Sequence, residues 1–326
     1  MSVSANDIII QKYDPQYSLA GAQYARNSLL YTYNRMGLGV NERMNKIVIG
    51  IAFEMAFKRW LDEKNIAYEY APTPFTEQDR ADLSIAGRRC DLKSFLLPRR
   101  NLIPMIEKQP AWLLDAPALV PLDQFNGNRM RETDLYIFGF ITGMQARTIE
   151  DTSTAIEKTG ASYLLYIIPD NRWNRRTQWE SLGHLAFKSN NDNPITIEVG
   201  GLGADKEEIH EEVVLQPRTR TPLVNNFYSI LYIHAHELPE AEIGLSSSVL
   251  RDVILVHQRD WTNIWLFGRR LFLCGWASKA DFREWSEHLP AGSRTKQYSA
   301  TKTHNRAMPI ASLRPMHELV TLFTEP

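Results

Sequence analysis

Residues 80–94 constrain the fold more than any other part of this chain, because their sequence fits a tight β-hairpin. If Ala86 and Gly87 form a two-residue loop, the residues on either side pair outward in register. In that register Asp82 lies directly opposite Asp91. The hairpin would therefore place two carboxylates face to face.

Two opposed carboxylates make a poor structural pair unless a cation lies between them, since like charges directly across a sheet destabilise it. Lys93, two residues after Asp91, shares their face of the strand. Hard Mg²⁺ is held by one or two carboxylates together with substrate phosphates, so the pattern favours phosphodiester hydrolysis. Two alternatives stay open. A three-residue loop would put Leu92 opposite Asp82, or both acids are ordinary surface residues with Lys93 as an ion-pair partner.

A third carboxylate, Glu54, lies in the apolar segment 45–62, which has the length of a helix. Ile51 precedes it by three residues, so Glu54 falls on an apolar stripe. Gly50 weakens a helix by about 1 kcal/mol relative to alanine, but it would let another backbone or a ligand approach closely. The alternative is that Glu54 forms an ordinary ion pair with Lys58, four residues later.

The order of helix acid, strand acid and a following Asp-x-Lys strand resembles the PD-(D/E)xK nuclease superfamily, which has the restriction-endonuclease-like fold. Glu54 matches the helix acid, Asp82 the first strand acid, Asp91 the second and Lys93 the lysine. Ala81 stands where the motif has its proline, a departure that makes the match less specific and removes no ligand.

The resemblance implies a Mg²⁺-dependent DNA endonuclease, with Mn²⁺ able to substitute, acting in restriction, antiviral defence or DNA processing. Its implied metal ligands are Asp82, Asp91, Glu54 and the backbone carbonyl of Leu92, and its catalytic set is Glu54, Asp82, Asp91 and Lys93. DNA is the implied partner, with a homodimer typical of double-strand cutters. The alternatives are a structure-specific or exonucleolytic repair nuclease, and a non-catalytic subunit of the same fold that binds nucleic acid or a protein partner.

The formal net charge of −1 excludes a protein covered by positive potential, so contact with nucleic acid must come from local patches. Arginines near the acids and in one later cluster are the candidates for binding the phosphate backbone. They are Arg88, Arg89, Arg99, Arg100, Arg172, Arg175 and Arg176.

The pattern of segments predicts an α/β fold with a mixed central sheet flanked by helices. A helical segment spans 1–39, the nuclease core comprises 40–145 and 261–326, and residues 146–260 form a mostly β inserted module for target recognition or partner binding. A hydrophobic content of 44% is ample for cores of this size.

Two local expectations concern the parts of the core beyond the hairpin. The Pro-rich stretch 96–131 has no clean period and suggests a long loop or lid over the site. Residues 264–276 suggest a hairpin beside a buried strand at 134–142, followed by a helix that starts at Ser278 with Asp281 in its capping turn.

The N-terminus lacks a basic start followed by a long apolar core, and no apolar run reaches spanning length. We therefore expect a soluble cytoplasmic protein with no membrane partner. His234 and His236 would share one strand face and form a weaker candidate metal site, because no further ligand with supporting spacing is evident.

Overall fold

The computed structural model describes residues 2–28, 40–70, 82–99, 101–127, 130–145, 148–159, 164–169, 172–174, 177–263 and 266–324. The chain divides into two compact units: residues 1–144 and 266–326 form the first, and residues 145–265 form the second. These bounds lie close to those of the predicted insert. The predicted N-terminal helical segment, 1–39, belongs to the first unit; it contains helix α1 (Pro15–Ser28), and residues 29–39 lie outside the described part of the chain.

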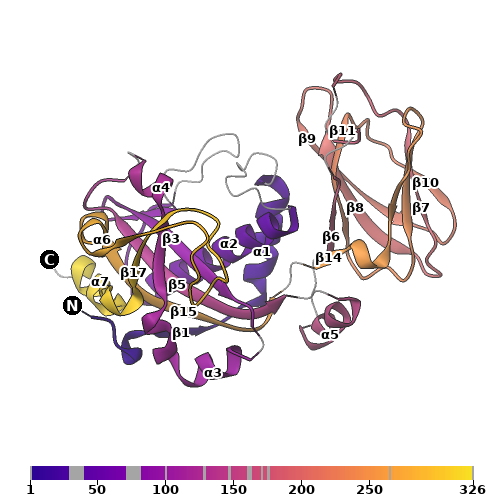
Figure 1. Ribbon diagram of the computed structural model, residues 1–326. Coiled ribbons are helices and arrows are strands. Elements are labelled where there is room, and N and C mark those ends of the chain that lie inside the picture. Colours follow the sequence, from indigo (N-terminus) through magenta and orange to yellow (C-terminus); the bar gives the residue numbers. More distant parts are fainter. Residues whose placement is uncertain are drawn as a thin grey trace. The chain divides into compact units, whose positions relative to one another are not determined.

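A five-stranded mixed sheet forms the centre of the first unit (Figure 1). β3 and β5 are parallel, whereas β1 pairs with β15 and β2 pairs with β3 in antiparallel fashion. Its strands, in spatial order, are β1 (Ile9–Lys12), β15 (Leu266–Ser278), β5 (Leu135–Gln145), β3 (Arg88–Leu97) and β2 (Leu83–Ile85). β1 shows that the N-terminal segment contributes a strand to the sheet as well as a helix.

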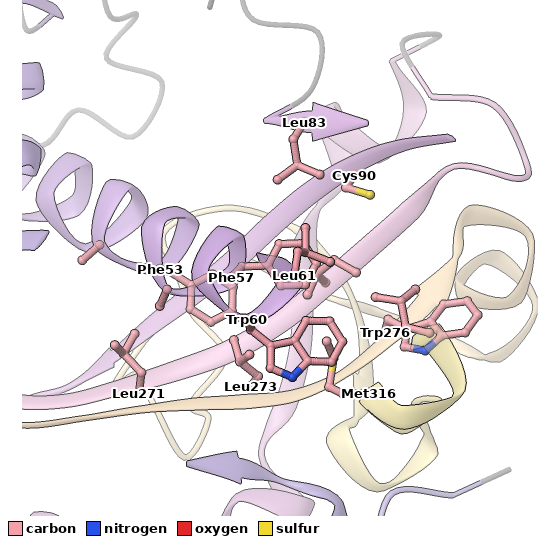
Figure 2. Close-up of a cluster of buried hydrophobic side chains, with 14 of the residues drawn as sticks. Phe53, Phe57, Trp60, Leu61, Leu83, Cys90, Leu271, Leu273, Trp276 and Met316 are labelled. Atoms are coloured by element: carbon pink, nitrogen blue, oxygen red, sulfur yellow. The ribbon is translucent and has the colours of Figure 1, made fainter. Parts of the chain in front are cut away.

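Helix α2 (Val40–Glu63) covers one face of this sheet, with α1 (Pro15–Ser28) packed against it. Phe53, Phe57 and Trp60 project from α2 into a core shared with the strands, as Figure 2 shows. Because α2 is covered by the sheet on one side and by α1 on another, apolar residues occupy most of its circumference.

Two glycines let α2 approach its neighbours closely. A Cβ atom at Gly139 of β5 would lie 2.2 Å from the ring of Phe53, and one at Gly21 of α1 would lie 2.8 Å from the Cα atom of Val48. Gly50 of α2 has no such role, since a Cβ there would meet nothing within 4 Å among the described residues. No described backbone therefore approaches Gly50 closely, and the approach of a ligand there stays a prediction.

The other face of the sheet is covered by segments that the sequence analysis took for a loop. The prediction of a long loop over 96–131 is wrong: this region contains α3 (Ile103–Lys108), the 3₁₀ helix η2 (Pro110–Asp115), β4 (Pro117–Pro121) and α4 (Leu122–Asn126). The elements are short because prolines begin or end most of them. Their buried residues join a second core, whose members include Phe95, Ile106, Leu113, Val120, Phe125, Phe138 and Phe282.

The C-terminal part of the chain completes this layer. β4 forms a three-stranded sheet with β17 (Asn305–Pro309) and β16 (Glu287–Leu289), followed by the 3₁₀ helix η4 (Ile310–Ser312). Helix α7 (Met316–Thr324) instead contributes Met316 and Leu319 to the core that α2 shares with the strands. A short 3₁₀ helix, η1 (Ala5–Asp7), precedes β1.

β15 lies beside β5, as predicted, but as one long strand. The predicted hairpin over 264–276 is wrong because β1 pairs with Arg270–Leu273 and keeps that stretch extended. The predicted helix is confirmed as α6 (Lys279–Trp285). Its N-cap is Ser278, whose hydroxyl accepts a hydrogen bond from the backbone N–H of Asp281.

The described residues of the second unit form mainly β-strands, and helix α5 (Ile149–Thr159) lies at its start. Its two sheets have the orders β10-β7-β12-β13 and β14-β6-β11-β8-β9. The elements are β6 (Leu164–Ile167), β7 (Leu185–Ser189), β8 (Ile195–Leu202), β9 (Glu208–Leu215), β10 (Arg220–Pro222), β11 (Ser229–Ala235), β12 (Ile243–Ser247), β13 (Ile254–Val256), η3 (Gln258–Asp260) and β14 (Thr262–Asn263). Phe187, Ile197 and Ile233 are fully buried in a core of this unit's own.

Among the helices described, none combines the length and the apolar character needed to cross a membrane.

Candidate active site

The hairpin has the predicted two-residue loop. Leu83 pairs with Cys90, and Ile85 pairs with Arg88 across the turn. Ala86 and Gly87 both have positive φ angles, 46° and 75°, as the tight turns favoured in hairpins require. The three-residue alternative, which would place Leu92 opposite Asp82, is thereby excluded.

Asp82 comes directly before Leu83, whose pairing with Cys90 is the outermost of the hairpin. It forms hydrogen bonds with β3 through both its backbone and its side chain. Its N–H donates to the carbonyl of Cys90 (3.1 Å), and its Oδ2 accepts a 2.6 Å hydrogen bond from the N–H of Leu92. The N–H and C=O of one strand residue point to the same edge, so the carbonyl of Leu92 is directed to the side where Asp82 lies. Among the described residues, the pairing of β2 with β3 extends as far as Leu83 and Cys90, so Asp82 lies just outside the regular ladder.

Asp91 and Lys93 form an ion pair along one face of β3. The Lys93 Nζ lies 2.7 Å from Asp91 Oδ1, and the side chains are only 14% and 24% exposed, respectively. Lys93 also donates a 3.1 Å hydrogen bond to Gln124 Oε1 of α4. Two acceptors thus fix the position of the ammonium group.

Glu54 faces inward from α2, as its apolar stripe predicts, and is 13% exposed. The predicted alternative of a pair with Lys58 is also present, with Nζ 2.5 Å from Glu54 Oε1. The same ammonium lies 3.2 Å from the centroid of the Tyr70 ring. Glu54 therefore has an inward position and a cationic partner at once.

The charged groups that shift the pKa of Asp82 include Asp91, Lys93 and Glu54. Burial, and then repulsion by Asp91, raises the pKa of Asp82 to about 7, with a further contribution from Glu54. The Leu92 N–H and the Lys93 ammonium act in the opposite direction. Asp82 therefore lies within electrostatic reach of all three of the other predicted catalytic residues.

The neighbouring thiol has no part in such chemistry. Cys90 is fully buried, and burial raises its pKa well above the usual range. The thiolate form required of a nucleophile is disfavoured there.

The predicted arginines separate into several groups. Arg88 and Arg89 begin β3, the strand that carries Asp91, whereas Arg99 lies beyond the other end of β3, two residues after Leu97. Arg172 belongs to the second unit and forms an ion pair with Asp252. Three further candidates, Arg100, Arg175 and Arg176, lie outside the described residues.

The cluster offers hard oxygen donors, the type of ligand that Mg²⁺ prefers. Within the described part of the chain, however, no three His, Cys, Asp or Glu side chains are already arranged as metal ligands. Each acid instead has a partner within the protein: Glu54 and Asp91 each face a lysine, and Asp82 faces a backbone N–H.

Sequence reasoning missed residues that support the site. Gln124 holds Lys93, but it lies in the stretch taken for a loop. Asp134 is fully buried and accepts hydrogen bonds from the N–H groups of Arg89 (3.0 Å) and Arg131 (2.7 Å), which ties the start of β3 to the start of β5. An acidic residue directly before a buried strand was the only signal available for Asp134.

The second candidate metal site gains neighbours from adjacent strands. The rings of His234 and His236 stack with centroids 4.9 Å apart, and His236 Nε2 lies 3.3 Å from Glu212 Oε2 of β9. Stacked imidazoles do not direct their nitrogen atoms at a common point, so this pair is not a preformed metal site.

Comparisons with known proteins give no match: no family model fits the sequence, and neither a curated protein nor a solved structure matches the chain.

Proposed function

We propose that this protein is a Mg²⁺-dependent nuclease of the PD-(D/E)xK type, which hydrolyses phosphodiester bonds of DNA in restriction, antiviral defence or DNA processing. The observation that carries the proposal is the convergence of Asp82, Asp91 and Glu54, with Lys93 beside them. The Leu92 N–H holds the Asp82 carboxylate at 2.6 Å, and burial together with the charges of Asp91 and Glu54 raises the pKa of that carboxyl.

Each residue has a role that follows from its position. Asp82, Asp91, Glu54 and the Leu92 carbonyl would hold the cation, and Mn²⁺ would fit the same oxygen donors. Bound there, Mg²⁺ would polarise the phosphate and lower the pKa of water. Lys93, already oriented by Asp91 and Gln124, stabilises negative charge that develops on the phosphate or holds the attacking water in line.

Two arginines at the start of β3 are the candidates for contacting an anionic substrate; the guanidinium of one of them, Arg88, lies over the Phe323 ring. Arg88 and Arg89 begin the same strand that carries Asp91. Phosphate contacts from such arginines position a nucleic acid without reading its sequence. Target recognition is assigned to the second unit, and a homodimer is proposed for cleavage of both strands.

One observation favours a second candidate, a non-catalytic subunit that binds nucleic acid or a protein. Both Glu54 and Asp91 already have lysine partners, so the negative charges of these two carboxylates are balanced without any metal. In that case the carboxylates would be structural, and their replacement would lower stability without affecting any reaction.

A substrate panel separates the two candidates. Supercoiled, linear and single-stranded DNA and single-stranded RNA are incubated with the protein and Mg²⁺, alongside the Asp91→Ala and Lys93→Ala variants. Asp192→Asn, an exposed carboxylate of the second unit, is the control. Cleavage that both site variants abolish and the control retains supports the nuclease; binding without cleavage in every metal supports the non-catalytic subunit.

A further inference from the structure

Lys58 is the second lysine of the acidic cluster. It follows Glu54 by one helical turn, and its side chain is only 18% exposed. The ammonium lies between two partners, the carboxylate of Glu54 at 2.5 Å and the face of the Tyr70 ring at 3.2 Å from its centroid. A cation over an aromatic ring is attracted by the ring's negative face, so both contacts keep Lys58 at the cluster.

The next residue on the helix shows what an ordinary pair of this spacing looks like. Arg59 and Glu63 form an ion pair of 3.0 Å, also four residues apart, with side chains 57% and 53% exposed. Solvent screens such a pair, and its contribution is small. The Lys58–Glu54 pair is much less exposed, so its two charges interact more strongly.

Two lysines of the cluster are paired with carboxylates that are proposed to bind the metal. Lys93 forms an ion pair with Asp91 and Lys58 forms one with Glu54, so two of the three acids already have an ammonium partner. A divalent cation at this cluster must therefore compete with an ammonium group for Glu54.

We infer that Lys58 is a second functional lysine, which occupies Glu54 before a divalent cation binds and then, released from Glu54, binds a phosphate oxygen of the substrate. This inference rests on the proposed nuclease function. Lys58 thereby sets the metal concentration that the site requires, and it supplies a positive charge once Glu54 has changed partner. The Tyr70 ring keeps the released ammonium near the cluster.

The test compares Lys58→Met with Arg59→Met, which removes the exposed pair of the same helix. Mn²⁺ affinity is measured without nucleic acid, and DNA cleavage is measured at saturating Mg²⁺. We expect Lys58→Met to bind Mn²⁺ on the order of five- to tenfold more tightly and to cleave at least about tenfold more slowly. Arg59→Met should match the wild type in both measurements.

A third variant, Lys58→Arg, should change Mn²⁺ affinity in the opposite direction to Lys58→Met. A guanidinium can hold a carboxylate through two parallel hydrogen bonds, so we expect weaker Mn²⁺ binding than in the wild type. Equal Mn²⁺ affinities in all three Lys58 proteins would overturn the competition, and normal cleavage by Lys58→Met would overturn the role at the phosphate. A wild-type protein that cleaves no nucleic acid would refute the proposed nuclease, while the Mn²⁺ affinities would still decide the competition.

Discussion

The backbone N–H of Leu92 donates a 2.6 Å hydrogen bond to Oδ2 of Asp82, across the point where the pairing of β2 with β3 ends. This contact holds a carboxylate beside Asp91, although the two negative charges repel each other. Burial, and then repulsion by Asp91, raises the pKa of Asp82 to about 7, although the hydrogen bond from Leu92 acts in the opposite direction.

The first prediction concerns pH and stability. The pKa of Asp82 is about 7 in the folded protein and near 3.8 in the unfolded chain, so the folded state binds more protons between these values. Stability is therefore lost as pH rises from about 4 to about 7, and the loss is complete above that window. Asp82→Asn carries no such charge, so its Tm should exceed that of the wild type by a few °C at pH 8 and by less at pH 5.

Thermal unfolding without metal, measured from pH 4 to pH 9, checks this prediction. A difference in Tm that does not change with pH would contradict it. Added Mg²⁺ should reduce or reverse the difference, because a bound cation favours the ionised carboxylate of the wild type.

The second prediction concerns the hairpin turn. Ala86 adopts a positive φ of 46°, where glycine is not strained, so Ala86→Gly should stabilise the first unit by roughly 0.5–1 kcal/mol. Gly87→Ala, at φ 75°, should destabilise it by about 1 kcal/mol. Urea unfolding measures both changes, and equal effects of the two substitutions would show that the loop does not have this conformation.

The third prediction contrasts two glycines near Glu54. Gly139→Ala would force the ring of Phe53 away from the sheet and should cost about 1–3 kcal/mol through overpacking. Gly50→Ala meets no neighbour among the described residues and should add up to about 1 kcal/mol through helix propensity. Chemical unfolding of both variants tests the prediction, and destabilisation by Gly50→Ala would indicate a close contact at that position.

The fourth prediction concerns the support of Lys93. Gln124→Leu removes one of its two acceptors and leaves the pair with Asp91 intact. A hydrogen bond to a charged group contributes about 1.5–3 kcal/mol, so we expect DNA cleavage to slow by roughly tenfold or more at saturating Mg²⁺. Mn²⁺ affinity without nucleic acid is the control and should stay near the wild-type value. Unchanged cleavage would mean that Asp91 alone positions Lys93.

The sequence predicted the hairpin well because its register depends on local chemistry alone. The two-residue loop at Ala86-Gly87, one of the two registers that the sequence left open, pairs the buried residues Leu83 and Cys90, and Asp82 lies within electrostatic reach of Asp91. The inward position of Glu54 likewise followed from helical spacing.

The sequence could not show how distant segments combine. The short elements between 96 and 131 owe their structure to packing in the second core, which includes residues near 282 and 308. Such packing leaves no periodic pattern in segments of five or six residues. The same reason hid Gln124, whose contact with Lys93 spans 31 positions of the chain.

The most direct test of the proposed metal centre is Mn²⁺ binding by the folded wild-type protein and by the Asp82→Asn and Asp91→Asn variants, measured by electron paramagnetic resonance without nucleic acid. We predict that the wild type binds Mn²⁺ at pH 8 and that each substitution weakens binding by tenfold or more. Equal binding by all three proteins, or no binding by the wild type, would contradict a metal centre at this hairpin.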